Sequence, residues 1–458
     1  MLSHSILVRS FIQSFNHSYL LVRTDRFKDT LYMPNPNLKY MSFYYNQEGS
    51  VHPFSESHPQ CEGIREVLEV LALERSVKLR LTIDLTMTPI FPLHHLPITS
   101  LELEMVASLH LRPDQYPSTL TDMSLSNNQP FSGTLNDMLP NSLKTLDLNN
   151  FHSWNQQIKP GSLPNKLESI EFNKRFNQVI QLRTFPDTLT RLRLGDSFDQ
   201  PLNGVLPPSL TCLTFGRLTY EHDLFDLPAS LTTIYLPGFF KRRLEHAPLQ
   251  RLHIYDDKMP RGGHSFPNLR KLWMKAWVSN MDWALFPAII RLTIDGSKSP
   301  DIDISTLPWT KLKNCKLFCE YGYVKWPLQF ASPIPFGVEK LALGNLNFPK
   351  IALGVLPPSI TRLALWNPVS IRHGHIPSSV TSLQIHNCDL EFDPRVVPPS
   401  VRDLTLTDVH VSDNLPIIKR VPITVMSLTI TSNWSSFILR RISDQYFFRS
   451  PSLNVNGY

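Results

Sequence analysis

The sequence predicts a repeat solenoid, a curved array of short coils with a parallel β-sheet on its concave face. Three observations favour this fold class. One motif recurs about every 22 residues along most of the 458-residue chain, its apolar positions alternate as in a strand, and a proline precedes every copy. Because so short a unit cannot bury its own apolar face, neighbouring units must stack and share one core.

The motif is a proline, a short gap, an aliphatic residue, two further residues, a leucine, any residue and a second apolar residue. The string GVLPPS, which opens one copy at 204–209, stands again at 354–359. The middle leucine or its replacement recurs at intervals of 18 to 26 residues, at Leu101, Met123, Leu146, Ile170, Leu192, Leu213, Ile234, Leu252, Leu272, Leu292, Cys315, Leu341, Leu363, Leu383, Leu404 and Leu428. We therefore predict about sixteen repeats over 91–431.

Each motif predicts one short strand. The middle leucine and the apolar residue two positions later point to the same face, and their neighbours point outward. The preceding proline starts the strand after a turn, where no amide donor is needed. The half-coils between strands are too short and too rich in proline for regular helices. We expect short 3₁₀ turns, loops and extended pieces on the convex side.

Composition and charge exclude several classes of protein. Apolar residues make up 42% of the chain and charged residues 18%, which excludes a wholly disordered polymer. A net charge of +6 spread over this length does not indicate a nucleic-acid partner. No apolar run approaches the ~18 residues that suggest a transmembrane segment. The five cysteines lack the spacing of a disulfide module, so we expect a reducing, cytoplasmic location.

Four consecutive units carry more than the general pattern. They read LPNSLKTLDLNNFHSWNQQI, LPNKLESIEFNKRFNQVI, FPDTLTRLRLGDSFDQPLNGV and LPPSLTCLTFG. They resemble the FNIP-repeat family, a leucine-rich-repeat variant with an LPxSLxxLxF strand followed by G-x-x-F-N-Q. The resemblance is strong over 139–237 and weaker over 91–431. It implies a leucine-rich-repeat-like fold and repeat-mediated protein interaction.

The second part of that pattern stands at two places, Phe176-Asn177-Gln178 and Phe198-Asp199-Gln200, with an echo at Trp154-Asn155-Gln156. The copies lie 22 residues apart, so we expect their aromatic rings to stack as a second core column. At the ladder position of ordinary leucine-rich repeats, only Asn128 and Cys388 are suitable. We therefore do not expect an ordered asparagine ladder.

The two ends of the chain differ from the array. We predict an N-terminal cap or small mixed segment over 1–90, with a short helix at 63–76 and a strand at 77–85. The alternative for 1–60 is an F-box-like module that binds a ubiquitin-ligase adaptor. The sequence PNLKYMSF at 36–43 is similar to PNLRKLWM at 267–274, which suggests that the repeats begin before residue 91. Residues 432–458 are expected to form a C-terminal hairpin or helix and a frayed tail.

No motif predicts catalysis, a cofactor or a metal site. The chain has no glycine-rich phosphate loop and no nucleophile elbow. Cys315 and Cys319 are four residues apart, but Cys315 occupies a core-leucine position and no second pair has zinc-like spacing. His94 and His95 are expected in a solvated turn. We predict a non-enzymatic protein.

The outward strand positions carry an uneven charge. The residue before the middle leucine is basic in five of six consecutive units, and we call Arg251, Lys271, Arg291, Lys340 and Arg362 the basic stripe. The sixth is Asn314, and the neighbouring columns add Trp273 and Tyr255. The first four units instead present Glu102, Asp122, Asp147 and Glu171. Two interpretations stay open, a solvated face or a site for an acidic partner.

The leading hypothesis is a protein-interaction scaffold that presents its concave sheet to an acidic protein. A second is the substrate-recognition subunit of a ubiquitin ligase, with 1–60 bound to the adaptor. A third is the recognition of an anionic polymer or a phosphoinositide surface by the basic stripe.

Overall fold

The structure, a computed structural model, describes residues 19–23, 40–45, 78–84, 99–104, 112–127, 133–136, 138–238, 240–244, 248–255, 265–275, 281–295, 307–308, 310–318, 334, 336–344, 353–366, 371–386, 394–407, 421–431, 436–443 and 446–450. The chain forms two compact units, Met1–Ala247 and Pro248–Tyr458.

The first unit is a ladder of parallel strands in which each strand pairs with the next in sequence. Its strands are β1 (Tyr19–Arg23), β2 (Tyr40–Tyr45), β3 (Lys78–Asp84), β4 (Ser100–Glu104), β5 (Asp122–Ser126), β6 (Thr145–Asp147), β7 (Ser169–Glu171), β8 (Arg191–Arg193), β9 (Cys212–Thr214) and β10 (Thr233–Tyr235). A 3₁₀ turn, η2 (Pro113–Gln115), precedes β5.

The second unit continues the same pattern of one strand per coil. Its parallel strands are β11 (Arg251–Ile254), β12 (Lys271–Met274), β13 (Arg291–Asp295), β14 (Asn314–Phe318), β15 (Lys340–Gly344), β16 (Arg362–Trp366), β17 (Ser382–His386), β18 (Asp403–Thr407) and β19 (Ser427–Thr431). Two antiparallel strands follow, β20 (Ser436–Arg441) and β21 (Phe447–Ser450). The 3₁₀ turns are η3 (Trp283–Leu285) and η5 (Pro394–Val396).

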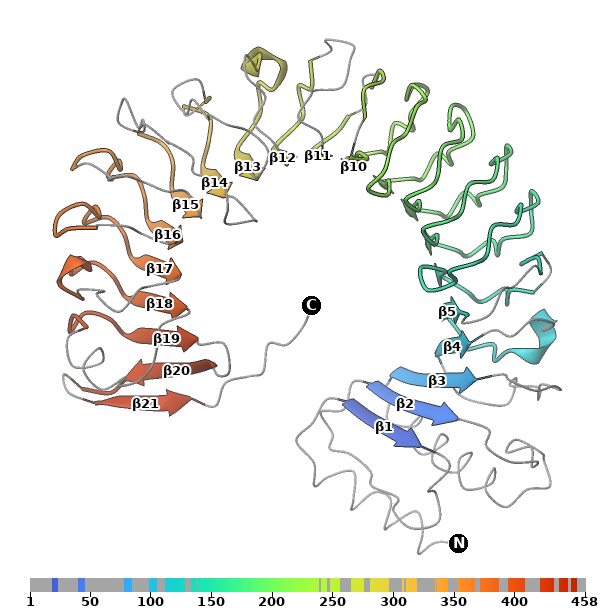
Figure 1. Ribbon diagram of the computed structural model, residues 1–458, viewed down its shortest axis with the longest axis horizontal. Coiled ribbons are helices and arrows are strands. Elements are labelled where there is room, and N and C mark those ends of the chain that lie inside the picture. The colour runs from blue at the N-terminus through green and yellow to red at the C-terminus, as the bar shows by residue number, and fades with distance from the viewer. Residues whose placement is uncertain are drawn as a thin grey trace, which may run out of the picture. The chain divides into compact units, whose positions relative to one another are not determined.

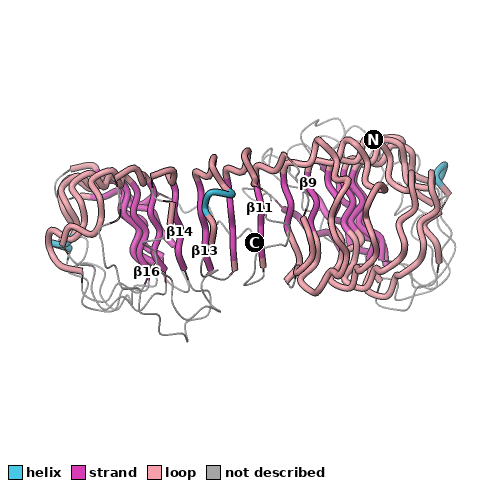
Figure 2. The backbone as a smooth tube through the Cα atoms, turned by 90° about the horizontal axis from the view of Figure 1, so that it is seen from above, coloured by secondary structure: helices cyan, strands magenta, loops and turns pink. Residues whose placement is uncertain are grey.

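The predicted fold class is confirmed, because each unit is a parallel β-solenoid whose described residues contain almost no helix. In each unit the strands lie together on the inner side of the curved stack, and the loops lie on the outer side (Figure 1). Figure 2 shows that strands and loops make up nearly all of the described coils. No helix among the described residues is long and apolar enough to cross a membrane.

The core of the solenoid consists of the apolar columns that the motif predicts. The middle residues of the sixteen motifs are at most 2% exposed, and the aliphatic residue three positions earlier is at most 1% exposed wherever its side chain is described. Cys315 takes a core position between Leu292 and Leu341, as predicted. The strand register therefore follows the apolar pattern, because a shift by one residue would turn this column toward solvent.

The proline and serine of the motif organise the turn before each strand. The carbonyl of Pro207 accepts a hydrogen bond from the backbone nitrogen of Leu210 at 3.1 Å, so the proline opens the turn and does not itself start the strand. The hydroxyl of Ser209 donates to the carbonyl of Leu189 in the previous coil at 2.7 Å. Thr211 donates in the same way to Thr190, at 3.0 Å. These side chains tie neighbouring coils together.

A stacked column of buried aromatic rings forms the second core of the first unit, as the repeat spacing predicts. Trp154, Phe176, Phe198, Tyr220 and Phe240 are at most 1% exposed. Successive rings are nearly parallel, with centroids 5.6 to 6.4 Å apart. Stacking at this separation is favourable beyond the burial of area alone. Since the column is closed and buried, its role is structural.

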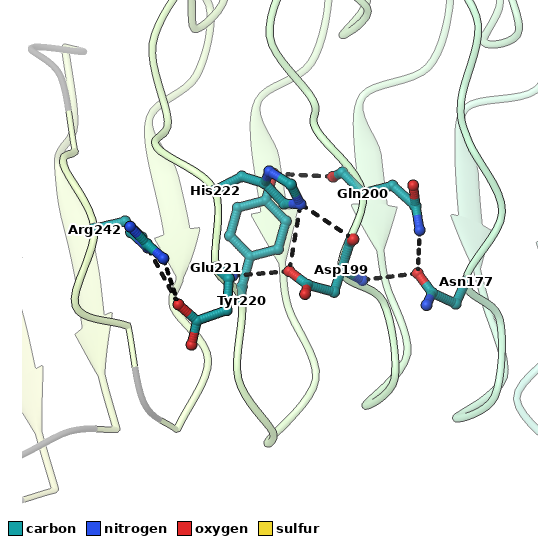
Figure 3. Close-up of polar contacts among 7 residues, drawn as sticks. All are labelled: Asn177, Asp199, Gln200, Tyr220, Glu221, His222 and Arg242. Atoms are coloured by element: carbon teal, nitrogen blue, oxygen red, sulfur yellow. Dashed lines mark hydrogen bonds and ion pairs between the residues drawn. The ribbon is translucent and has the colours of Figure 1, made fainter.

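An amide ladder that the sequence analysis did not foresee runs beside the aromatic column. The Asn177 Oδ1 atom accepts hydrogen bonds from the Asp199 backbone nitrogen at 2.9 Å and from Gln200 Nε2 at 3.0 Å (Figure 3). Asn155 makes the same two bonds with Asn177 and Gln178, at 2.9 and 3.2 Å. The ladder uses the residue after the aromatic ring, a position different from that of ordinary leucine-rich repeats.

The glycines that follow β8 and β9, Gly195 and Gly216, are required for steric reasons. A β-carbon on Gly195 would overlap the carbonyl oxygen of Asn173 in the previous coil, and one on Gly216 would overlap the backbone of Asp196. Only glycine permits this close approach of backbones.

The ends of the chain contain more strands than the motif count predicts. The strand expected at 77–85 is present as β3, and β2 pairs with it in parallel, placing Met41 beside Leu79. The sheet therefore begins before residue 91, as the imitation at 36–43 suggested. At the other end, the antiparallel strands β20 and β21 confirm the hairpin option. The predicted helix at 63–76, with Asn128, Cys319, Cys388, His94 and His95, lies outside the described residues.

Candidate binding site on the sheet face

The basic stripe lies in one continuous column of the second unit. The register pairs Arg251 with Lys271 and Lys271 with Arg291 on β11–β13. Asn314 interrupts the column on β14, and Lys340 and Arg362 continue it on β15 and β16. Lys271 is partly exposed, and the other four basic side chains are exposed. The strands thus bring together all five residues that the sequence assigned to the stripe.

The strand geometry fixes this arrangement. Because the neighbouring core residue of each strand is buried, the residue before it must point away from the core. Neighbouring strands lie ~4.8 Å apart, so the cationic side chains are rooted at that spacing wherever they are adjacent. Like charges directly opposite one another are destabilising in a sheet. The stripe is thus a local departure from what stability alone would select.

Other columns of the same chain pair opposite charges across strands. Lys313 and Glu339, one position before the stripe, form an ion pair with 3.0 Å between Nζ and Oε1. In the first unit, Lys144 pairs with Glu168 at 2.9 Å and Arg193 pairs with Glu171 at 3.3 Å. Among the described residues, none of the five stripe side chains has a carboxylate within ion-pair distance.

The electrostatic strain of the stripe is visible at Lys271. The positive charge of Arg251, followed by burial and the charge of Arg291, lowers the pKa of the Lys271 ammonium below its ordinary value. At the interruption, the amide of Asn314 oriented with its oxygen toward Arg291 accepts a hydrogen bond from Arg291 Nε at 3.0 Å. A neutral acceptor therefore holds one guanidinium without neutralising its charge.

Aromatic side chains lie beside the first two strands of the stripe, β11 and β12. The Trp273 ring stacks on His253 with centroids 5.8 Å apart and contacts Tyr255 at 4.9 Å. All three side chains are partly exposed. Burial, followed by the charge of Arg251, lowers the pKa of His253 to about 4, so this ring is neutral at physiological pH. Trp273 and Tyr255 thus present apolar surface next to the stripe, as the sequence predicts.

A pocket of about 360 Å³ lies at the far end of the stripe, and sequence reasoning missed it. Its lining includes Arg291, Lys340 and Arg362, together with Lys316, Ala342 and Ala364 from the next outward column. The two alanines are paired in the register of β15 and β16. Small residues at one outward position of two consecutive strands are the sequence signal that could have revealed it.

The acidic positions of the first unit do not mirror this column. Glu102, Asp147 and Glu171 share one outward column with Arg193, whereas Asp122 lies in the other. Burial and the charge of Asp147 raise the pKa of Glu171, against the opposing effect of Arg193. In this column the acidic Glu171 is therefore already paired with an arginine of the same chain, Arg193.

No group of three or more histidine, cysteine, aspartate or glutamate side chains in the described part of the chain could hold a metal ion. Cys315 is 2% exposed, and burial raises the pKa of its thiol well above the ordinary range.

The fold and its open sheet face define a class, the leucine-rich-repeat-like solenoid typical of binding scaffolds. Residues 154–190 and 176–218 match the FNIP repeat family, so the chain contains FNIP repeats, as its resemblance predicts.

One solved structure extends the likeness to most of the chain. The crystal structure of CroV588, a novel circular LRR protein, has a TM-score of 0.57 and 22% sequence identity, covering 89% of this chain and 58% of that chain. At this identity the likeness concerns the fold alone, and this chain spans less than two thirds of that protein. No curated protein sequence matches the chain.

Proposed function

We propose that the protein is a cytoplasmic, non-enzymatic scaffold that binds an acidic protein on the sheet face of its second unit. The observation that supports this most strongly is the basic stripe, in which five cations lie in one column and have no carboxylate within ion-pair distance among the described residues. A partner carboxylate would relieve the repulsion between neighbouring side chains. Complementary charge also increases the rate of association.

The aromatic neighbours of the stripe support a protein partner. Arginine and aromatic side chains are the usual anchors of protein interfaces. Arg251 lies on the same strand as His253, whose ring stacks on Trp273. The strands hold the backbone of these residues in a regular sheet, so little backbone entropy is lost when a partner binds. The proposal needs no cofactor and no metal.

A charge-reversal experiment tests the proposal. The triple variant Lys271→Glu, Arg291→Glu and Arg362→Glu changes exposed or partly exposed positions, each expected to alter stability by only about 0.5 kcal/mol. Partners recovered with the wild-type protein by affinity purification and mass spectrometry should be lost from the variant. The binding of these partners to the wild-type protein should weaken as the salt concentration rises. Any binding that the triple variant retains should not depend on salt.

A matched control separates the stripe from net charge. The variant Lys311→Glu, Arg372→Glu and Arg440→Glu reverses three exposed cations of the second unit that lie outside the stripe. It should retain the partners. Equal recovery from wild type and from the stripe variant would overturn the proposal. Recovery of ubiquitin-ligase adaptor and cullin subunits by both variants would instead support an adaptor-binding function of 1–60.

A further inference from the structure

The pocket at the end of the stripe is a recess with a defined floor, which distinguishes it from a run of surface charge. Its floor is the alanine pair Ala342 and Ala364, both partly exposed. In the same outward column, Lys316 precedes this pair and Gln384 follows it. Short side chains on two consecutive strands leave a recess between these longer ones, and β14 and β17 lie about 14 Å apart at the usual strand spacing.

Four cations surround this recess. Lys340 and Arg362 stand on the same strands as the two alanines, in the adjacent column of the stripe. Arg291 lines the pocket two strands before Lys340. Lys316 closes the near end, and no described carboxylate lies within ion-pair distance of any of the four. The recess is therefore a site of concentrated positive charge with a small apolar floor.

Aromatic rings hold Lys316 in position. Its Nζ lies 4.5 Å from the ring centroid of Phe318 and 5.6 Å from that of Trp366. The Trp366 ring can occupy this place because the intervening residue is Gly344, where a β-carbon would lie 3.0 Å from the Trp366 ring and 3.0 Å from Phe318 Cβ. Such cation–π contacts orient an ammonium without neutralising it. His386 stacks on Trp366 at 4.3 Å, which fixes the ring further.

We propose that this pocket binds the phosphoryl group of a phosphorylated side chain of the partner protein. A carboxylate carries one charge and two oxygens, and one guanidinium satisfies it. A phosphate monoester carries nearly two charges and three strong acceptor oxygens at neutral pH, which suits several converging donors. Arg291 and Arg362 supply guanidinium groups, whose geometry fits phosphate oxygens. The inference rests on the proposed function and names the group that the stripe recognises.

The position of the pocket favours a protruding ligand over a flat or continuous one. It lies on the sheet of the second unit, whose strands form the inner side of the curved stack, where a planar lipid surface would meet the flanking coils first (Figure 1). The cationic column does not continue past the pocket, because Ser382 and then Asp403 follow Arg362. A single recessed phosphoryl group fits this better than a long polyanion.

The test uses four immobilised pools of seven-residue peptides, degenerate around a fixed phosphoserine, phosphotyrosine, glutamate or serine. The full-length wild-type protein should be retained by at least one phosphorylated pool about tenfold more than by the glutamate and serine pools. Vesicles of phosphatidylcholine with a phosphoinositide should retain it no better than vesicles of phosphatidylcholine alone.

Two variants and a control assign retention to the pocket. Arg362→Gln removes one pocket cation and Ala364→Leu fills the recess, and each should lower retention by the phosphorylated pool about tenfold. Arg372→Gln, an exposed cation outside both the stripe and the pocket lining, should lower it less than about twofold. Thermal unfolding of each variant confirms that it is folded.

The outcomes also separate this inference from the proposed function. Equal retention by phosphorylated and glutamate pools, or retention that Ala364→Leu leaves unchanged, would overturn the phosphoryl site while the stripe remains an acidic-partner surface. No retention by any phosphorylated pool would overturn it too. Selective binding to phosphoinositide vesicles would replace the protein ligand with a lipid. Loss of partners from the stripe variant alone tests only the proposed function.

Discussion

The side-chain oxygen of Asn177 lies 2.9 Å from the backbone nitrogen of Asp199 in the next coil and accepts its hydrogen bond (Figure 3). This contact explains why the aromatic residue, the amide and the glutamine are consecutive in the repeat. The ring of Phe198 fills the core column, and the next residue turns its side chain toward the following coil. Two columns of different chemistry thus advance together, one coil at a time.

Replacing Asn177 by alanine should destabilise the first unit. The substitution leaves the Asp199 backbone nitrogen and the Gln200 amide without their acceptor. An unsatisfied polar group costs about 1–3 kcal/mol of unfolding free energy when water reaches it poorly. Urea unfolding followed by far-UV circular dichroism measures this difference.

Asn177→Asp is the control, because it retains a side-chain oxygen at the same place. The next coil already uses a carboxylate there, since Asp199 accepts a hydrogen bond from the Glu221 backbone nitrogen at 2.8 Å. The aspartate variant should unfold close to wild type. An alanine variant as stable as the aspartate variant would show that the ladder contributes nothing.

The sequence predicts the strands and both core columns because burial of apolar side chains leaves a periodic trace. Leu192 and Phe198 illustrate this, as each is 1% exposed and each was placed in the core from spacing alone. The amide ladder also recurs in the sequence, at Asn155, Asn177 and Asp199, but spacing alone does not reveal its hydrogen bonds, since Asn177 bonds to a backbone nitrogen that any residue provides. The pocket was missed for a related reason. The pocket forms because Ala342 and Ala364 have short side chains. Two short side chains leave a recess only when their strands are neighbours in the sheet.

Leu192→Asp should unfold or aggregate the protein. Leu192 lies between Ile170 and Leu213 in the core column and is 1% exposed. Burying an unpaired carboxylate there costs several kcal/mol, or else the strand leaves the stack. The control is Arg191→Asp, which puts the same group on the exposed face one residue away. Size-exclusion chromatography and thermal melting compare the two, and a soluble Leu192→Asp variant that melts normally would remove this residue from the core.

The two cysteines with described surroundings should differ in reactivity. Cys315 is 2% exposed, and burial raises the pKa of its thiol, so little thiolate is available to react. Cys212 is partly exposed on the outward face of β9. Iodoacetamide labelling of the native protein, followed by peptide mass spectrometry, should modify Cys212 first. Labelling of Cys315 before Cys212 would show that the strand register is wrong in one of these coils.

His253 should make the second unit sensitive to acid. Burial and Arg251 lower the pKa of its imidazole from 6.5 to about 4, so the unfolded chain takes up this proton at a higher pH than the folded chain. Between these two values the unfolded state binds more protons, and stability therefore falls as the pH is lowered from about 6.5 to about 4. Above this window the group has no effect, and below it the loss is complete.

His253→Phe keeps a ring against Trp273 and removes the titrating group. Each tenfold change in proton affinity corresponds to about 1.4 kcal/mol, and partial exposure reduces the effect, so we expect about 1–2 kcal/mol in total. Urea unfolding of wild type and variant at pH 7.5 and pH 4.5 isolates this contribution, because the other groups titrate in both proteins. The variant should lose less stability than wild type by that amount. Equal losses would mean that His253 is protonated in the folded protein as readily as in the unfolded chain.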